Sequence, residues 1–187
     1  MALKIDQIKD LQDNSIISKS GSNITLGASN DTIAFASGIT NNLLTPSFSA
    51  MAASDQSIST TTVTVLNFGT EIYDTNNAYD GTNKFTVPSG YAGKYYFNAH
   101  LRIDGIDDTK FAQIGLYING STNVGAEGVS TNSYVYSSKA NAAMSFGTNG
   151  IVDLSVGDEV QVFIYQDSGT KSTVANYTGF RGFRIGA

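Results

Sequence analysis

Residues 95–103 restrict the fold of this chain more than any other segment, because two kinds of side chain alternate along them. The mainly apolar series, expected on one side, is Tyr95, Phe97, Ala99, Leu101 and Ile103. The mainly polar series, expected on the other side, is Tyr96, Asn98, His100 and Arg102. A period of two residues is that of a β-strand with one buried face. The segment therefore predicts an antiparallel sheet that covers a core on one side only.

Several other short segments after residue 46 are rich in β-forming residues. They are residues 61–65, 113–118, 151–154, 160–165 and 180–185. The pair Asn119-Gly120, directly after one of them, is typical of a two-residue hairpin turn. No segment after residue 12 has the period of a long amphipathic helix. Short strands with glycine- and asparagine-rich turns between them predict an all-β sandwich or barrel.

The first 45 residues differ from the rest of the chain. The apolar residues Leu3, Ile5, Ile8 and Leu11 have a spacing that suggests one or two short helical turns. Residues 24–26 and 33–35 are short β-prone pieces between Gly, Asn and Ser, too short to form a core. The segment is therefore either a tether or a stalk wound with other chains, and the sequence leaves both open. Pro46 marks the predicted boundary between a segment 1–45 and a domain 46–187.

Composition excludes several kinds of function. The chain has 187 residues, no cysteine, one histidine and a formal net charge of −5. The absence of cysteine excludes disulfides, thiol catalysis and zinc sites with cysteine ligands. The negative charge argues against nucleic acid as a partner. The first residues contain no apolar run long enough for a signal peptide or a membrane span, so we expect neither general secretion nor membrane insertion.

A spaced set of aromatic, glycine and aspartate residues resembles the signature of a known family. Its first part is Phe68, Asp74, Tyr79, Phe85, Gly93, Tyr95 and Phe97, and its later parts are Gly157 and Asp158, then Phe180, Gly182 and Phe183. This set is similar to that of the C1q-like domain, whose jelly roll is shared with the tumour-necrosis-factor superfamily. The resemblance implies an all-β, antiparallel jelly-roll sandwich over residues 46–187 that assembles as a homotrimer. All of these residues are expected to form core and turns.

The segment 1–45 resembles, in style, the low-complexity lead-ins of virion appendage proteins from tailed bacteriophages. That resemblance implies a non-enzymatic virion protein: a tail fibre, a spike or a capsid decoration. Residues 1–45 would attach it to other virion proteins, and the trimeric head would engage a host surface receptor or a glycan. Such a protein is made in the host cytoplasm and ends in the virion.

Two other functions stay open at this point. One is a soluble, extracellular recognition or signalling protein of the C1q or tumour-necrosis-factor type. The other is a hydrolase of surface polysaccharide, which would need a pocket with two carboxylates about 5–10 Å apart.

Few residues suggest chemistry, and we expect no catalytic or cofactor-binding residue. His100, the single histidine, lies on the polar side of its predicted strand, and no serine lies in a G-x-S-x-G motif. Asp104, Asp107 and Asp108 form a small acidic loop that could bind calcium, a cation that prefers oxygen ligands. The loop lacks the regular spacing of a dedicated calcium site, so a solvated turn is the alternative. No other metal or cofactor is expected.

Residues 119–143 are small, polar and glycine-rich, and they contain Tyr134 and Tyr136 at alternate positions. Tyrosine among serine, glycine and asparagine is typical of binding loops, because it offers a large amphipathic surface with few torsions to fix. The segment is therefore a candidate contact loop. The alternative is a surface loop with an edge strand whose tyrosines pack on a neighbouring subunit.

Overall fold

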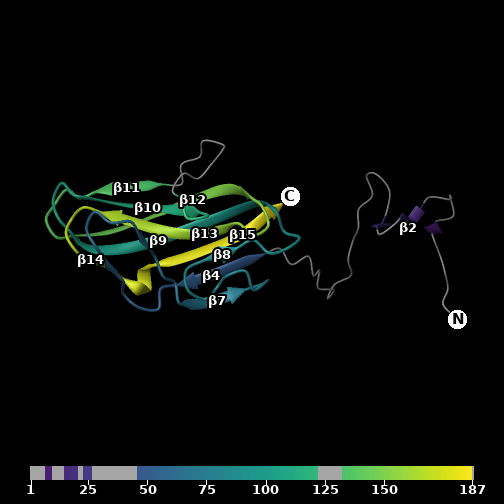
Figure 1. The fold of residues 1–187 in the computed structure, drawn as a ribbon, viewed down its shortest axis with the longest axis horizontal. Coiled ribbons are helices and arrows are strands. Elements are labelled where there is room, and N and C mark those ends of the chain that lie inside the picture. The colour runs from purple at the N-terminus through teal and green to yellow at the C-terminus, as the bar shows by residue number, and fades with distance from the viewer. Residues whose placement is uncertain (1–6, 10–14, 21–22, 27–45, 122–131, 187) are drawn as a thin grey trace. The chain divides into compact units, whose positions relative to one another are not determined.

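The computed structural model describes residues 7–9, 15–20, 23–26, 46–121 and 132–186 (Figure 1). The chain divides into two compact units, Met1–Asn42 and Leu43–Ala187. The first unit holds a three-stranded antiparallel sheet of β1 (Gln7–Lys9), β2 (Ser15–Ser20) and β3 (Asn23–Leu26). The helical turn expected around Ile8 was therefore wrong, because pairing with β2 outweighs the weak helical tendency of so short a segment. The β-prone piece at residues 33–35 lies outside the described residues.

The larger sheet of the second unit is organised around β9 (Gly93–Ile106). One edge of β9 pairs with β12 (Ala142–Leu154). Its other edge pairs with β15 (Gly179–Gly186) and, further along, with β14 (Lys171–Thr173). The sheet continues from β15 to β4 (Ser47–Met51) and β7 (Thr70–Asp74), and from β14 to β5 (Ser57–Ile58).

The smaller sheet has β13 (Glu159–Gln166) at its centre. One edge pairs with β10 (Phe111–Ile118), which in turn pairs with β11 (Ser133–Tyr136). The other edge pairs with β6 (Thr64–Val65) and β8 (Phe85–Thr86). In Figure 1 the long strands run roughly along the length of this unit. The prediction of an all-β antiparallel jelly-roll sandwich is confirmed.

Helical structure is confined to one short element in the described part of the chain. It is the 3-10 helix η1 (Ala175–Tyr177), which connects β14 to β15. The described residues accordingly contain no helix with the length and apolar character needed to cross a membrane.

A cluster of four phenylalanine rings fills the space between the two sheets. We call Phe48, Phe85, Phe97 and Phe180 the inner ring cluster; each is 0% exposed. The ring centroid of Phe48 lies 5.2 Å from that of Phe85 and 4.8 Å from that of Phe180. The ring centroids of Phe97 and Phe85 are 5.4 Å apart. Gly182 permits this packing, since a Cβ there would lie 2.4 Å from the ring of Phe97. Burial of such rings is the main source of stability in a sandwich of this kind.

Three further aromatic residues of the signature are buried beside this cluster. Phe68, Tyr79 and Tyr95 are at most 6% exposed. The Tyr79 hydroxyl donates to the carbonyl of Phe68 at 3.0 Å, and the Tyr95 hydroxyl donates to that of Tyr91 at 2.7 Å. Each buried phenol therefore has the hydrogen-bond partner that burial requires.

The remaining polar and glycine residues of the signature lie in turns or at the ends of strands. An Asp74 carboxylate oxygen accepts from the backbone N–H of Tyr79 at 2.7 Å. An Asp158 carboxylate oxygen accepts from the N–H of Ser155, also at 2.7 Å, and closes the turn before β13. Gly157 in that turn has a φ of 87°, and Gly93 at the start of β9 has a φ of 135°; both lie in a region that favours glycine.

Phe183 was expected to be a core residue, but it is not one. It is 47% exposed and lies on the outward side of β15, opposite to the buried Phe180. The two positions are three residues apart, so strand alternation places them on opposite faces. Phe183 belongs to a surface.

Candidate binding surfaces

An apolar row crosses the outward face of the larger sheet. Tyr96 of β9 is opposite Ile151 of β12 in one ladder and opposite Phe183 of β15 in the other. We call these three residues the apolar row. Ile151 is 54% exposed and Phe183 is 47% exposed, while the rings of Tyr96 and Phe183 lie 5.5 Å apart. Large apolar side chains that adjoin one another on a rigid sheet are typical of a contact surface.

The polar part of the same face contains His100. Its ring lies over Gly179, where a Cβ would lie 2.8 Å from the imidazole carbon Cε1. Its Nδ1 lies 3.4 Å from Nη2 of Arg181. Burial and, secondly, the charge of Arg181 lower the pKa of His100, so the neutral ring is favoured. A guanidinium neighbour does not orient a histidine as a general base in the way that a carboxylate does.

Tyr134 and Tyr136 lie on β11, the edge strand of the smaller sheet. They are 54% and 68% exposed, and their rings lie near that of Phe111 on the neighbouring strand. The candidate contact loop 119–143 therefore contains a strand that carries its two tyrosines outward. Its residues 122–131 lie outside the described residues, and its last residues begin β12.

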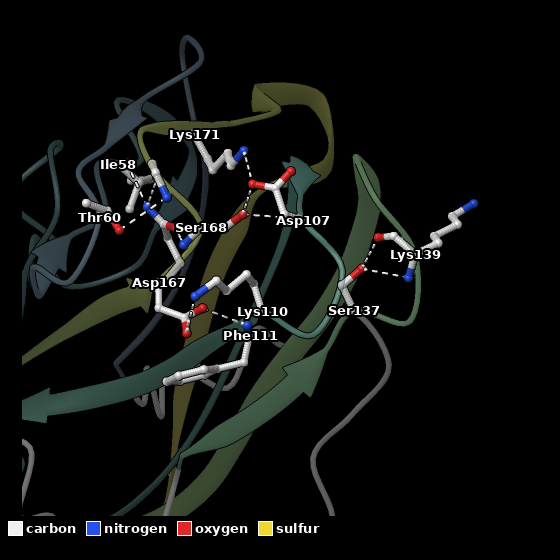
Figure 2. Close-up of polar contacts among 12 residues, drawn as sticks. Ile58, Thr60, Asp107, Lys110, Phe111, Ser137, Lys139, Asp167, Ser168 and Lys171 are labelled. Atoms are coloured by element: carbon white, nitrogen blue, oxygen red, sulfur yellow. Dashed lines mark hydrogen bonds and ion pairs between the residues drawn. The ribbon is translucent and has the colours of Figure 1, made fainter.

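The three aspartates of the acidic loop have separate partners, and Figure 2 shows those of Asp107. Asp104 binds the guanidinium of Arg102 at 2.8 Å. Asp107 accepts from the hydroxyl of Ser168 at 2.8 Å and from the amine of Lys171 at 3.3 Å.

Asp108 accepts from the backbone N–H of Thr109 at 3.0 Å. Hydrogen bonds from Ser168 and Lys171 lower the pKa of Asp107.

The residues that the structure describes include no group of three His, Cys, Asp or Glu side chains that could hold a metal ion. Calcium at Asp104, Asp107 and Asp108 stays a prediction, and a thermal melt with and without added calcium tests it.

A polar hollow of about 330 Å³ lies beside β5 and the start of β7. It is lined by Ala53, Ser54, Asp55, Gln56, Ser57, Asn67 and Gly69. Asp55 is the one carboxylate among these residues, and it accepts from the backbone N–H of Ala175 at 2.8 Å. Hydrolysis of a glycosidic bond in the usual way needs two carboxylates, so this hollow lacks the groups that the hydrolase hypothesis requires.

Comparison with known proteins identifies the family. The model of the C1q domain matches residues 47–185, so the chain belongs to the C1q domain family. A search of curated proteins found no match.

Many solved structures share the fold, and two of them serve as examples. The globular domain of zebrafish complement 1qA protein is 20% identical, with a TM-score of 0.54 over 75% of this chain and 98% of that one. Murine APRIL, from a crystal structure at pH 5.0, is 13% identical, with a TM-score of 0.52 over 76% of this chain and 100% of that one. The predicted likeness to the C1q and tumour-necrosis-factor fold is confirmed.

Proposed function

We propose that this chain is a non-enzymatic recognition protein that assembles as a homotrimer through the outward face of its larger sheet. The observation that carries the proposal is the apolar row, because the sandwich core does not need these side chains and water solvates them poorly. Packing the same face of three copies around an axis would bury the row on each of them. Membership of the C1q domain family supports this assembly.

The surroundings of three titratable side chains support the proposal that the protein is not an enzyme. His100 adjoins Arg181, and Asp104 and Asp107 are bound by Arg102 and Lys171. A nucleophile or a general base instead needs a partner that activates it and a space for the substrate. We infer that the protein acts by binding.

The proposal also concerns where the protein acts, either outside a cell or as part of a virion. Family membership supports an extracellular recognition protein more directly than it supports a virion appendage. Attachment of residues 1–45 to other virion proteins, and of the head to a host receptor, stays a prediction from the sequence. It is tested by removing residues 1–45: the shortened chain should remain folded and trimeric but no longer join a particle.

The test of the trimer uses sedimentation equilibrium on the whole chain. We expect a species of three times the chain mass, and we expect Phe183→Glu to yield monomers with an unchanged circular dichroism spectrum. Three carboxylates brought into one buried interface would be desolvated without partners. Val156→Glu is the control, because Val156 is 52% exposed but lies in the turn before β13. A monomeric wild type, or a trimeric Phe183→Glu variant, would contradict the proposal.

A further inference from the structure

Four aromatic rings gather on the outward face of the smaller sheet. They belong to Phe111, Tyr134, Tyr136 and Tyr165, which we call the aromatic platform. Phe111 lies at its centre: the ring centroids of Tyr134, Tyr136 and Tyr165 are 6.2, 5.5 and 5.7 Å from that of Phe111. The interplanar angles are all between 31° and 39°. The rings come from three paired strands, so the sheet fixes their spacing.

The platform is not needed to fill the core. On β10 the core is reached by Ala112, Ile114 and Leu116, which are 0% exposed. On β11 it is Val135 that packs against the core, while the tyrosines on either side of it stay exposed. Exposed aromatic area that adds little to folding is characteristic of a surface that binds something.

Amide and hydroxyl groups accompany the rings. Gln113 lies opposite Tyr134 in one ladder and opposite Tyr165 in the other, on the same outward side of β10 as Phe111. A glutamine amide both donates and accepts hydrogen bonds, and so does each phenol. The platform therefore offers apolar ring faces with uncharged polar groups between and around them.

The charges beside the platform neutralise each other. Lys110 and Asp167 approach to 3.7 Å, and the second carboxylate oxygen of Asp167 accepts from the backbone N–H of Phe111 at 2.9 Å. Figure 2 shows this pair beside the backbone of Phe111, whose ring points away from Asp107. Among the described residues, this edge of the platform therefore offers a mutually neutralised ion pair rather than a lone cation or a lone anion, which favours an uncharged ligand.

We propose that the aromatic platform binds an uncharged oligosaccharide. A pyranose ring has a flat face of C–H groups that can pack on an aromatic ring, and a rim of hydroxyls that can bond to phenols and amides. The proposal rests on the recognition function proposed above and assigns it a ligand class and a site. The platform lies on the sheet opposite to the apolar row, so assembly through the row would leave the platform of each copy uncovered.

The test measures binding of the whole chain to immobilised maltohexaose, cellohexaose, xylohexaose and mannohexaose, with oligogalacturonate as the acidic comparison. We expect at least one neutral hexasaccharide to bind. Tyr136→Ser should weaken that binding at least about tenfold, whereas Tyr136→Phe, which keeps the ring, should change it less than about threefold. Tyr177→Ser is the matched control, because Tyr177 is 55% exposed and lies outside the platform.

Three results would overturn the proposal: no neutral hexasaccharide binds, only oligogalacturonate binds, or Tyr177→Ser weakens binding as much as Tyr136→Ser. Sedimentation of the same samples separates this proposal from the proposed function. A trimer that binds none of these sugars refutes the platform alone. A monomer refutes the proposed assembly, whatever it binds.

Discussion

The inner ring cluster and the aromatic platform are built from the same kind of side chain at similar separations, yet they differ in exposure. Ring centroids in the inner cluster lie 4.8–6.4 Å apart, and those around Phe111 lie 5.5–6.2 Å apart. The four inner rings are 0% exposed, whereas Tyr134 and Tyr136 are 54% and 68% exposed. Aromatic clustering alone therefore does not distinguish a core from a binding surface.

The side of its strand on which a ring lies decides whether that ring joins the core or the surface. On β9 the buried side carries Phe97, so its ring joins the core. On β10 the buried side carries smaller residues, so Phe111 is turned outward. A shift of one residue in either strand would exchange the two faces. The comparison predicts large effects of substitution on the inner side and small ones on the outer side.

The largest effect is expected from Phe97→Ala. Removal of a fully buried ring should lower the free energy of unfolding by about 3–5 kcal/mol, because transfer and cavity costs add. Urea denaturation at one fixed protein concentration measures it, since assembly makes stability depend on concentration. A loss below about 1 kcal/mol would mean that the inner ring cluster does not hold the sheets together.

A smaller loss is expected from Gly182→Ala. The added methyl would meet the ring of Phe97 at 2.4 Å and that of Phe48 at 3.1 Å, so the inner rings must shift. Overpacking of this kind should cost about 1–3 kcal/mol in the same denaturation experiment. Gly186→Ala on the same strand is the control, because a Cβ there meets nothing within 4 Å. Equal effects of the two substitutions would contradict the packing account.

The outward side of β9 provides a test by pH. The pKa of His100 is below its ordinary value of 6.5 in the folded state, so the unfolded chain takes up the proton first as the pH falls. Stability should therefore decrease between pH 6.5 and the lowered pKa. His100→Gln should flatten that part of the curve of thermal midpoint against pH. Arg181→Gln removes the smaller cause of the lowered pKa, so it should narrow the pH range over which stability decreases. An unaltered curve in His100→Gln would assign the pH dependence to other groups.

The smallest effect is expected from Tyr136→Ser. An exposed side chain on an edge strand contributes only cross-strand contacts, so the free energy of unfolding should change by less than about 1 kcal/mol. Urea denaturation of this variant and of Phe97→Ala under the same conditions compares the two losses in free energy of unfolding directly. A loss as large as that of the core variant would show that the aromatic platform belongs to the folding core rather than to a binding surface.

Some parts of the fold and of the surfaces could be predicted from local sequence. The alternation at residues 95–103 is reproduced along β9, and Asn119 and Gly120 adopt φ values of 52° and 73° in a tight turn. By contrast, β12 is thirteen residues long, although only residues 151–154 were expected to be a strand. Its earlier part contains Gly147 and Asn149, residue types with weak strand tendencies. Gly147 is needed because a Cβ there would lie 2.5 Å from the carbonyl oxygen of Ala99.

Local sequence patterns specify that this chain forms antiparallel strands, which side chains alternate on each of them, and where glycine turns divide them. These properties follow from backbone geometry within a few residues. Local patterns do not specify that Ile151, Tyr96 and Phe183 form one row, or that Phe111 meets two tyrosines of β11; these contacts arise from the pairing of the strands. Their strands become neighbours through pairing between distant segments, and that pairing depends on how the whole sandwich closes around its core.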